Sequence, residues 1–216
     1  MLLLFFLLTV LVTALALATI ANFAPRFCVS LGLWLLLTLL IAARGVLADF
    51  SRRPPPMLLL IVVSVVLTTS LAFSPYGRHL ARNTPMPWLV GFQAFRILVE
   101  IFLDWGSHEG LVPPQMTFEG RNWDILTGIS AVPVAWLAAR GRIPRGGILA
   151  WNLLGVGLLV NIVTIAMLSM PTALQRFTTP NTFVTGAPYV WLPTFLVQAA
   201  WFGHLLVFRR LAQPAD

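Results

Sequence analysis

Four charged or titratable residues recur at every fourth position of the apolar segment FRILVEIFLDWGSHEG, which spans residues 95–110. They are Arg96, Glu100, Asp104 and His108. Each four-residue step advances about 40° around an α-helix, so the four side chains form one slowly spiralling stripe. Ionisable groups inside a bilayer usually face a bundle interior or a water-filled cavity. The stripe is therefore a candidate site, in which Arg96 and Glu100 are expected to pair at the i,i+4 spacing.

The loop that follows the stripe supplies a second set of polar groups. Its sequence is SHEGLVPPQMTFEGRNWD, and it carries Glu119, Arg121 and Asp124 at the membrane face where the stripe emerges. We predict that loop and stripe together line one polar vestibule. The candidate site consists of Arg96, Glu100, Asp104, His108, Glu119, Arg121 and Asp124.

Each of these residues also has a purely structural interpretation. Arg96 and Glu100 would then be a buried ion pair that fixes helix packing. Asp124, like Asn122, is more simply the cap of the next helix. Glu119 and Arg121 would form a solvated local pair. On the functional interpretation the outer members of the stripe, Asp104 and His108, are the first place to look for activity.

Metal binding is the first chemistry to consider, because carboxylates and imidazole are common metal ligands. However, Glu100 and His108 are separated by about 12 Å along a straight helix, which is too far for one ion. The chain has no HExxH motif, no paired ExxH and only one cysteine, Cys28. We therefore predict neither a metal site nor a cofactor.

The composition identifies the class of protein. The chain has 216 residues, of which 58% are hydrophobic and 10% charged, with a mean hydropathy of +0.87. Soluble domains carry about 25% charged residues. Apolar runs long enough to cross a bilayer recur along the chain. We predict an all-α fold, a polytopic transmembrane helical bundle that forms a single membrane domain over residues 1–216.

Seven spans are expected, with six as the alternative count. The N-terminal run is interpreted as the first span, because it lacks the positive n-region of a signal peptide and exceeds the usual apolar length. The polar residues Asn152, Asn161 and Gln198 are candidates for hydrogen bonds between spans. The expected spans are Leu2–Phe23, Cys28–Leu47, Met57–Phe73, Met86–Trp105, Trp123–Ala139, Gly147–Met170 and Val184–Phe208.

Arginine positions predict the orientation in a bacterial inner membrane. All of the net charge of +7 rests on fourteen arginines, since the chain has no lysine. With the N-terminus outside, more arginines fall on the cytoplasmic side, although the RRPPP loop favours the opposite orientation. This topology places His79 and His204 toward the face opposite the vestibule. The arginines on the inner side are Arg26, Arg78, Arg82, Arg140, Arg142, Arg145, Arg209 and Arg210, against Arg44, Arg52, Arg53, Arg121 and Arg176 outside.

The same charges indicate which partners to expect. A basic balance in a membrane protein is typical of loops that face an anionic leaflet. No basic patch lies on a polar surface, so a nucleic-acid partner is not expected. The expected partners are membrane lipids, together with either a second copy of the chain or another membrane subunit.

The segment FRILVEIFLDWGSHEGLVPPQMTFEGRNWDILTG, residues 95–128, resembles a group of uncharacterised bacterial multi-pass membrane proteins. They share an FRxxVE helix and a GLxPxxMTFEGRNxD loop. The resemblance implies a membrane protein and no known activity.

Two other families of membrane proteins do not fit the sequence. Membrane zinc hydrolases of the ceramidase and progestin-receptor type have a closely spaced histidine pair late in the chain, and His204 has no such partner. Retinal proteins need a Schiff-base lysine, and none is present.

Three functions remain open. The leading one is a small transporter, channel or ligand-binding membrane protein, in which Arg96 neutralises Glu100 or holds an anion while Glu100 or Asp104 relays protons or binds a cation. The second is a membrane enzyme acting on lipid or another apolar substrate, with Asp104, His108 or Glu119 as acid or base. There, Arg121 would orient an anionic headgroup. The third is an assembly subunit whose stripe faces outward and pairs with another chain.

Overall fold

The computed structural model describes residues 1–213, and every regular element in that range is a helix. The elements are α1 (Leu2–Ile20), α2 (Pro25–Ala43), η1 (Val46–Ala48), α3 (Pro56–Phe73), α4 (Pro75–Asn83), α5 (Met86–Gly91), η2 (Phe92–Phe95), α6 (Arg96–His108), η3 (Pro114–Met116), α7 (Ile125–Ala139), α8 (Arg145–Leu168), η4 (Phe183–Thr185), the π-helix η5 (Leu192–Leu196) and α9 (Val197–Leu211). The all-α prediction is confirmed for these residues.

Five helices are long and apolar enough to cross a membrane. They are α1, α2, α3, α8 and the continuous rod Met86–His108, which joins α5, η2 and α6. The other two expected spans correspond to α7, an apolar helix of 15 residues, and to η5 with α9. Seven therefore remains a prediction.

The shortness of α7 has a local cause. The span was expected to begin at Trp123, but the chain is helical only from Ile125. Asn122 and Asp124 are both buried, so the end of the preceding loop enters the bundle. This short loop segment occupies the space that a further helical turn would fill. It delivers polar side chains into the helix packing.

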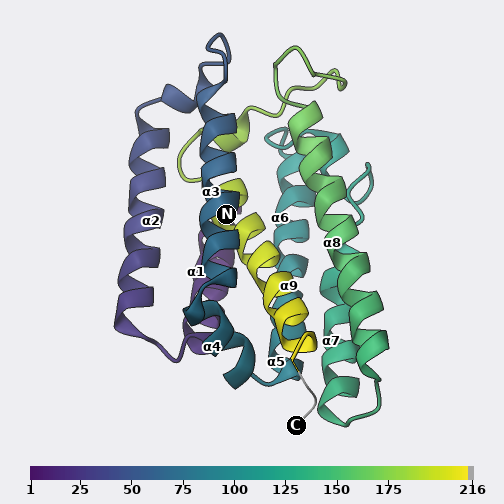
Figure 1. The fold of residues 1–216 in the computed structure, drawn as a ribbon. Coiled ribbons are helices and arrows are strands. Elements are labelled where there is room, and N and C mark those ends of the chain that lie inside the picture. Colours follow the sequence, from purple (N-terminus) through teal and green to yellow (C-terminus); the bar gives the residue numbers. More distant parts are fainter. Residues whose placement is uncertain (214–216) are drawn as a thin grey trace.

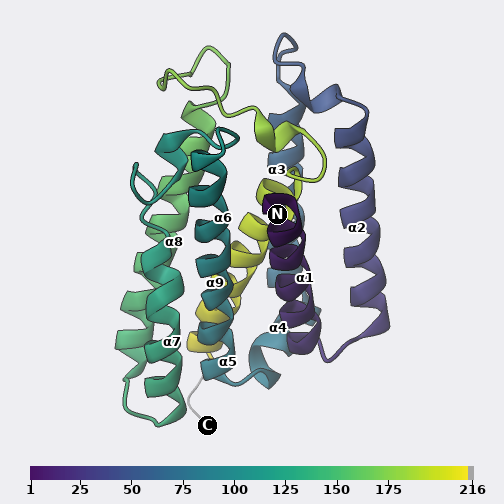
Figure 2. The same cartoon turned by 180° about the vertical axis from the view of Figure 1, so that it is seen from behind.

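The helix α9 runs through the middle of the bundle, with α1, α3, α6, α7 and α8 around it (Figures 1 and 2). It contacts α3, α4, α5 and α8, and an unbroken run from Phe202 to Val207 is buried. By contrast, α2 lies at the edge of the bundle, where only Thr38 and Ala42 are buried. A polar side chain on α9 is thus surrounded by protein, whereas the outer helices present apolar side chains such as Leu33 and Val62.

The two ends of the bundle differ in charge. One end holds α4, the turn between α7 and α8, and the end of α9 (Figure 1). Its described residues carry eight arginines and no Asp or Glu. The opposite end holds the loops that follow α2, α6 and α8. The carboxylates Asp49, Glu109 and Glu119 belong to that second end.

Candidate functional site

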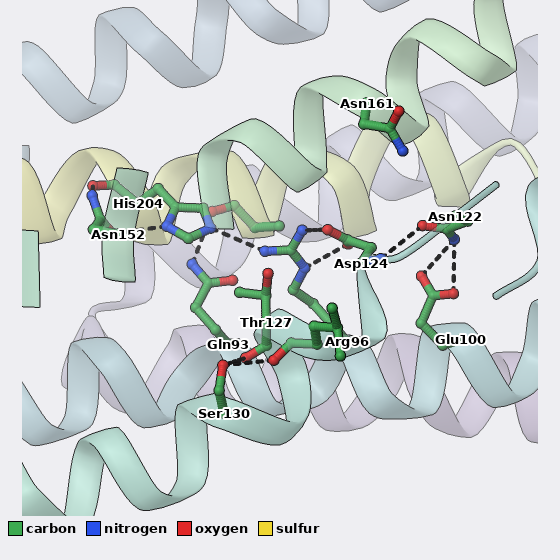
Figure 3. Close-up of polar contacts among 12 residues, drawn as sticks. Gln93, Arg96, Glu100, Asn122, Asp124, Thr127, Ser130, Asn152, Asn161 and His204 are labelled. Atoms are coloured by element: carbon green, nitrogen blue, oxygen red, sulfur yellow. Dashed lines mark hydrogen bonds and ion pairs between the residues drawn. The ribbon is translucent and has the colours of Figure 1, made fainter. Parts of the chain in front are cut away.

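Arg96 lies at the centre of a buried polar network on α6. The side chain is 2% exposed. Its Nε donates to Oδ2 of Asp124 at 2.6 Å, and its Nη2 donates to Oδ1 of the same carboxylate. On its other side, Nη1 lies 3.0 Å from Nε2 of His204 (Figure 3). One guanidinium thus joins α6 to the start of α7 and to the middle of α9.

The hydrogen bonds around His204 determine which ring nitrogen carries its proton. The Nδ1 atom lies 2.7 Å from Oδ1 of Asn152, an atom that can only accept a hydrogen bond. Nδ1 therefore carries the hydrogen, and Nε2 accepts from Arg96. The amide of Asn152 also donates to the backbone oxygen of His204 at 3.2 Å. The result is a neutral imidazole held from both sides.

Glu100 forms the other end of the network. It is 1% exposed, and its two oxygens accept from Nδ2 of Asn122 at 2.8 and 2.7 Å. The same amide donates to the backbone oxygen of Met116, while Oδ1 of Asn122 accepts the N–H of Asp124. We call the connected set the buried polar chain. Its members in order are Asn152, His204, Arg96, Asp124, Asn122 and Glu100 (Figure 3).

The expected ion pair between Arg96 and Glu100 is wrong, because the guanidinium pairs with Asp124. A planar guanidinium favours the two parallel bonds that one carboxylate can accept. The inserted loop presents Asp124 in that geometry, which a glutamate one turn along the same helix does not. Asp124 does occupy the N-cap position of α7, but its side chain makes no capping bond. The capping prediction for Asp124 is therefore wrong as well.

Four of the seven candidate residues lie outside the buried polar chain, toward the exposed end of α6. Nδ1 of His108 lies 2.9 Å from the backbone oxygen of Asp104 and 3.8 Å from its carboxylate. His108, Glu119 and Arg121 are exposed and Asp104 is half-buried. The Arg121 guanidinium lies over the ring of Phe177, 5.6 Å from its centroid. The structure thus separates a buried inner part from an exposed rim.

His204 was not among the predicted site residues, because it was expected near the opposite membrane face. The structure places it seven residues into α9 from Val197, level with Arg96 in the bundle. Gly155 of α8 makes room for the ring: a Cβ at that position would lie 2.5 Å from Cε1 of His204. The sequence did carry a signal for His204. It is a histidine well inside an apolar span, and another span offers glycines and an asparagine.

Of the three polar residues expected to bond between spans, Asn152 does so, whereas Asn161 bonds to the loop before α7 and Gln198 bonds within its own segment. Asn152 bonds across from α8 to α9, and Asn161 donates to the backbone oxygen of Arg121 at 2.9 Å. Gln198 instead donates to Pro193 within its own segment. Beside the buried polar chain, Gln93 donates from η2 to the backbone oxygen of Ala200 at 3.0 Å.

Two buried oxygens beside Arg96 have no hydrogen-bond partner among the described residues. They are Oε1 of Gln93 and Oγ1 of Thr127, and Figure 3 shows both side chains next to the guanidinium. Buried polar atoms in native proteins are normally satisfied, often by ordered water. These two oxygens are therefore where a water molecule or a small polar ligand would complete the bonding.

Neither a metal cluster nor a described cavity coincides with the network. Among residues 1–213, no three His, Cys, Asp or Glu side chains are arranged to hold a metal ion. One cavity of about 1060 Å³ lies between α2, α3 and α9, and another of about 460 Å³ lies between α1 and α5. No member of the buried polar chain lines either cavity.

Comparison with known proteins gives one match. The model of a family described as "Domain of unknown function (DUF8737)" matches residues 53–212, which is more than half of the chain. The chain belongs to this family. The matched region contains the whole buried polar chain, from Arg96 to His204. No curated protein and no solved structure matches the chain. The FRxxVE and GLxPxxMTFEGRNxD resemblance stays a prediction.

Proposed function

We propose that this DUF8737 member is a small transporter or channel of the bacterial inner membrane. Glu100 would be its proton- or cation-binding group. The observation that carries the proposal is the buried polar chain, which runs between helices that are apolar toward their outside. A protein that used these helices only as an anchor would have no need of six connected polar side chains at this depth.

The charges within the chain single out Glu100. The buried polar chain holds two carboxylates and one guanidinium, and Arg96 is bound to Asp124 by two hydrogen bonds. Within the part of the chain that the structure describes, Glu100 makes no ion pair and accepts only from Asn122. A buried carboxylate without a cationic partner is the group best suited to take up a proton or a small cation. Arg96 and Asp124 then act as a positioning pair.

The rim supplies the entrance in this proposal. Asp104 lies one helical turn from Glu100, roughly 6 Å along α6, and is half-buried. His108, one turn further, is exposed. A proton or cation would pass from this rim to Glu100, in a protein oriented with its arginine-rich end in the cytoplasm.

The other two functions have less support. An outward-facing stripe would suit an assembly subunit, but Arg96 and Glu100 are buried within the chain itself. An enzyme would need His108 within hydrogen-bond reach of a carboxylate, but Nδ1 of His108 lies 3.8 Å from the carboxylate of Asp104. The proposal therefore stays with ion binding and transfer.

Ion flux in proteoliposomes tests the proposal. Wild-type protein should dissipate an imposed pH gradient, reported by a trapped pH-sensitive dye, faster than empty liposomes; Na⁺ and K⁺ gradients are the parallel assays. Glu100→Gln should lower the rate at least about tenfold, because the amide keeps the shape but carries no exchangeable charge. Glu109→Gln, at an exposed loop position, is the matched control and should keep the wild-type rate. Wild-type flux equal to that of empty liposomes, or full flux in Glu100→Gln, would overturn the proposal.

A further inference from the structure

A second feature of the molecule, separate from the buried polar chain, is the cavity of about 1060 Å³ between α2, α3 and α9. It is at the upper end of the size range of small-molecule sites. Its walls are mostly apolar, with leucine, phenylalanine and Trp34 side chains. The polar residues of the lining come from several helices and include Arg26, Tyr76 and Gln198.

The attachment of α2 explains why the cavity exists. The indole Nε1 of Trp34 donates to the backbone oxygen of Thr194, and Nε1 of Trp191 donates to that of Leu35, both at 2.9 Å. These bonds tie the middle of α2 to the π-helix η5. Between Pro25 and Trp34 the helix lines the cavity instead of packing closely on α9. Figures 1 and 2 show α2 at the edge of the bundle.

One end of the cavity, which we call its mouth, is lined by residues of the arginine-rich end. Arg26 and Ser74, which line it, belong to the chain segments at that end. The side chain of Arg26 is exposed and makes no hydrogen bond or ion pair with the described residues. No Asp or Glu lies at this end within residues 1–213. An anionic group is thus favoured at the mouth.

Two residues that line the cavity, Gln198 and Tyr76, each carry a buried polar atom without a hydrogen-bond partner among the described residues. The side chain of Gln198 is 95% buried, since 5% of it is exposed, and its Nε2 donates to the backbone oxygen of Pro193 at 3.0 Å. Its Oε1 has no partner, and neither has the hydroxyl of Tyr76. A free amide oxygen accepts a hydrogen bond, so it selects a ligand with a hydroxyl or N–H donor.

Helix geometry gives the depth of Gln198 relative to the mouth. Trp34 bonds to Thr194, so the two residues lie at a similar depth. Arg26 is eight residues from Trp34 toward the mouth, about 12 Å, while Gln198 is four residues from Thr194, about 6 Å. Gln198 therefore lies about one helical turn deeper than Arg26. This is the spacing between a phosphate headgroup and a polar group in the backbone of a lipid.

We propose that the cavity binds a phosphate-bearing lipid from the leaflet at the arginine-rich end, one that carries a free hydroxyl or amide N–H next to its headgroup. The phosphate lies at Arg26, with the Tyr76 hydroxyl beside it. The donor group meets Oε1 of Gln198, and one acyl chain extends along the apolar wall toward Trp34. Ordinary annular lipid needs none of these polar contacts, which is what makes the site selective.

Binding of defined lipids to purified protein in nonionic detergent tests this assignment. The probe is oleoyl lysophosphatidic acid, which has a phosphate, a free hydroxyl and one chain. Two comparison lipids remove one feature each: oleoyl lysophosphatidylcholine lacks the net negative charge, and oleyl phosphate lacks the hydroxyl. Titrations follow the fluorescence change that is lost in Trp34→Phe. Wild-type protein should bind the probe about tenfold more tightly than either comparison lipid.

Substitutions assign the contacts. Arg26→Gln should remove the preference over lysophosphatidylcholine, and Gln198→Leu should remove the preference over oleyl phosphate. Ser30→Phe fills the cavity from α2 and should weaken binding of all three lipids, whereas Val29→Phe, exposed and outside the cavity, should leave the affinities unchanged. Equal affinity of wild-type protein for the three lipids, or equal binding by Ser30→Phe and Val29→Phe, would overturn the proposal. The readout is binding, so it is independent of any ion flux.

Discussion

Nη1 of Arg96 lies 3.0 Å from Nε2 of His204, although 108 residues separate them along the chain. Both side chains are buried, and each is held on its other side, Arg96 by Asp124 and His204 by Asn152. A buried guanidinium without partners would cost several kcal/mol, so this contact restricts how α6, α7, α8 and α9 can be arranged. Two of the four predictions that follow rest on this contact.

Removing the partner of Arg96 should destabilise the protein strongly. In Asp124→Asn the guanidinium stays buried but loses its charged partner, which in comparable buried pairs costs about 3–5 kcal/mol. Thermal unfolding in detergent, followed by circular dichroism, should show a clearly lower Tm. Asp49→Asn is the control, because Asp49 pairs with the exposed Arg52 in a loop, and its loss should lower the Tm far less. Equal Tm values for the two variants would contradict the structural role given to Asp124.

The fit of α8 against His204 should depend on Gly155. A Cβ there would lie 2.5 Å from Cε1 of His204 and 2.9 Å from Cγ2 of Thr127, so Gly155→Ala should cost about 1–3 kcal/mol. Gly157, two residues along α8, has nothing within 4 Å of an added Cβ. Gly157→Ala should therefore be neutral or stabilise by up to about 1 kcal/mol through helix propensity. The two Tm values compare positions on one helix, and a reversed order would contradict the described packing.

The proposed orientation can be tested with single cysteines. In a Cys28→Ser background, Glu119→Cys should react with a membrane-impermeant maleimide in intact cells, because it lies in the loop at the proposed outer end. Arg142→Cys, in the turn between α7 and α8, should react only after the membrane is permeabilised. The opposite labelling pattern would show that the arginine-rich end faces outward and would reverse the direction of entry proposed for Glu100.

Asp49, in the loop between α2 and α3, should show a local pH effect. The hydroxyl of Ser51 donates to Oδ1 of Asp49 at 2.5 Å and its backbone N–H donates at 3.1 Å, and this bonding holds the pKa of Asp49 below its usual value. Ser51→Ala removes the hydroxyl bond, so the pKa should rise toward the ordinary value in an NMR titration of the carboxyl carbon.

The sign of the linked stability effect follows from the direction of that shift. A carboxyl whose pKa is depressed on folding stabilises the folded state above its unfolded pKa, and this contribution is lost as the pH falls through the folded pKa. In Ser51→Ala the free energy of unfolding should therefore fall less as the pH is lowered through the pKa of Asp49. Between neutral and alkaline pH the free energy of unfolding of the variant should stay constant. An unchanged pKa in the variant would show that the hydroxyl bond does not hold the carboxylate.

Local sequence was sufficient for the helices and for the inner stripe. Whether a segment can cross a membrane depends on the length and composition of one apolar run, so α1, α2, α3, α8 and the Met86–His108 rod could all be expected from the sequence. The same holds for the burial of Arg96 and Glu100, which follows from their depth in an apolar helix. Both properties belong to a single segment of the chain.

Tertiary structure decided which polar groups meet. Arg96 bonds to Asp124 and His204 because the end of one loop enters the bundle and because α9 runs through its centre. Neither fact is written in the periodicity of any one helix, since the rotation and depth of helices relative to one another depend on all their contacts together. For the same reason the cavity beside α2, lined in part by Gln198, has no signature in the sequence. The sequence alone determined the class of protein and one wall of its polar site, and helix packing determined the partners.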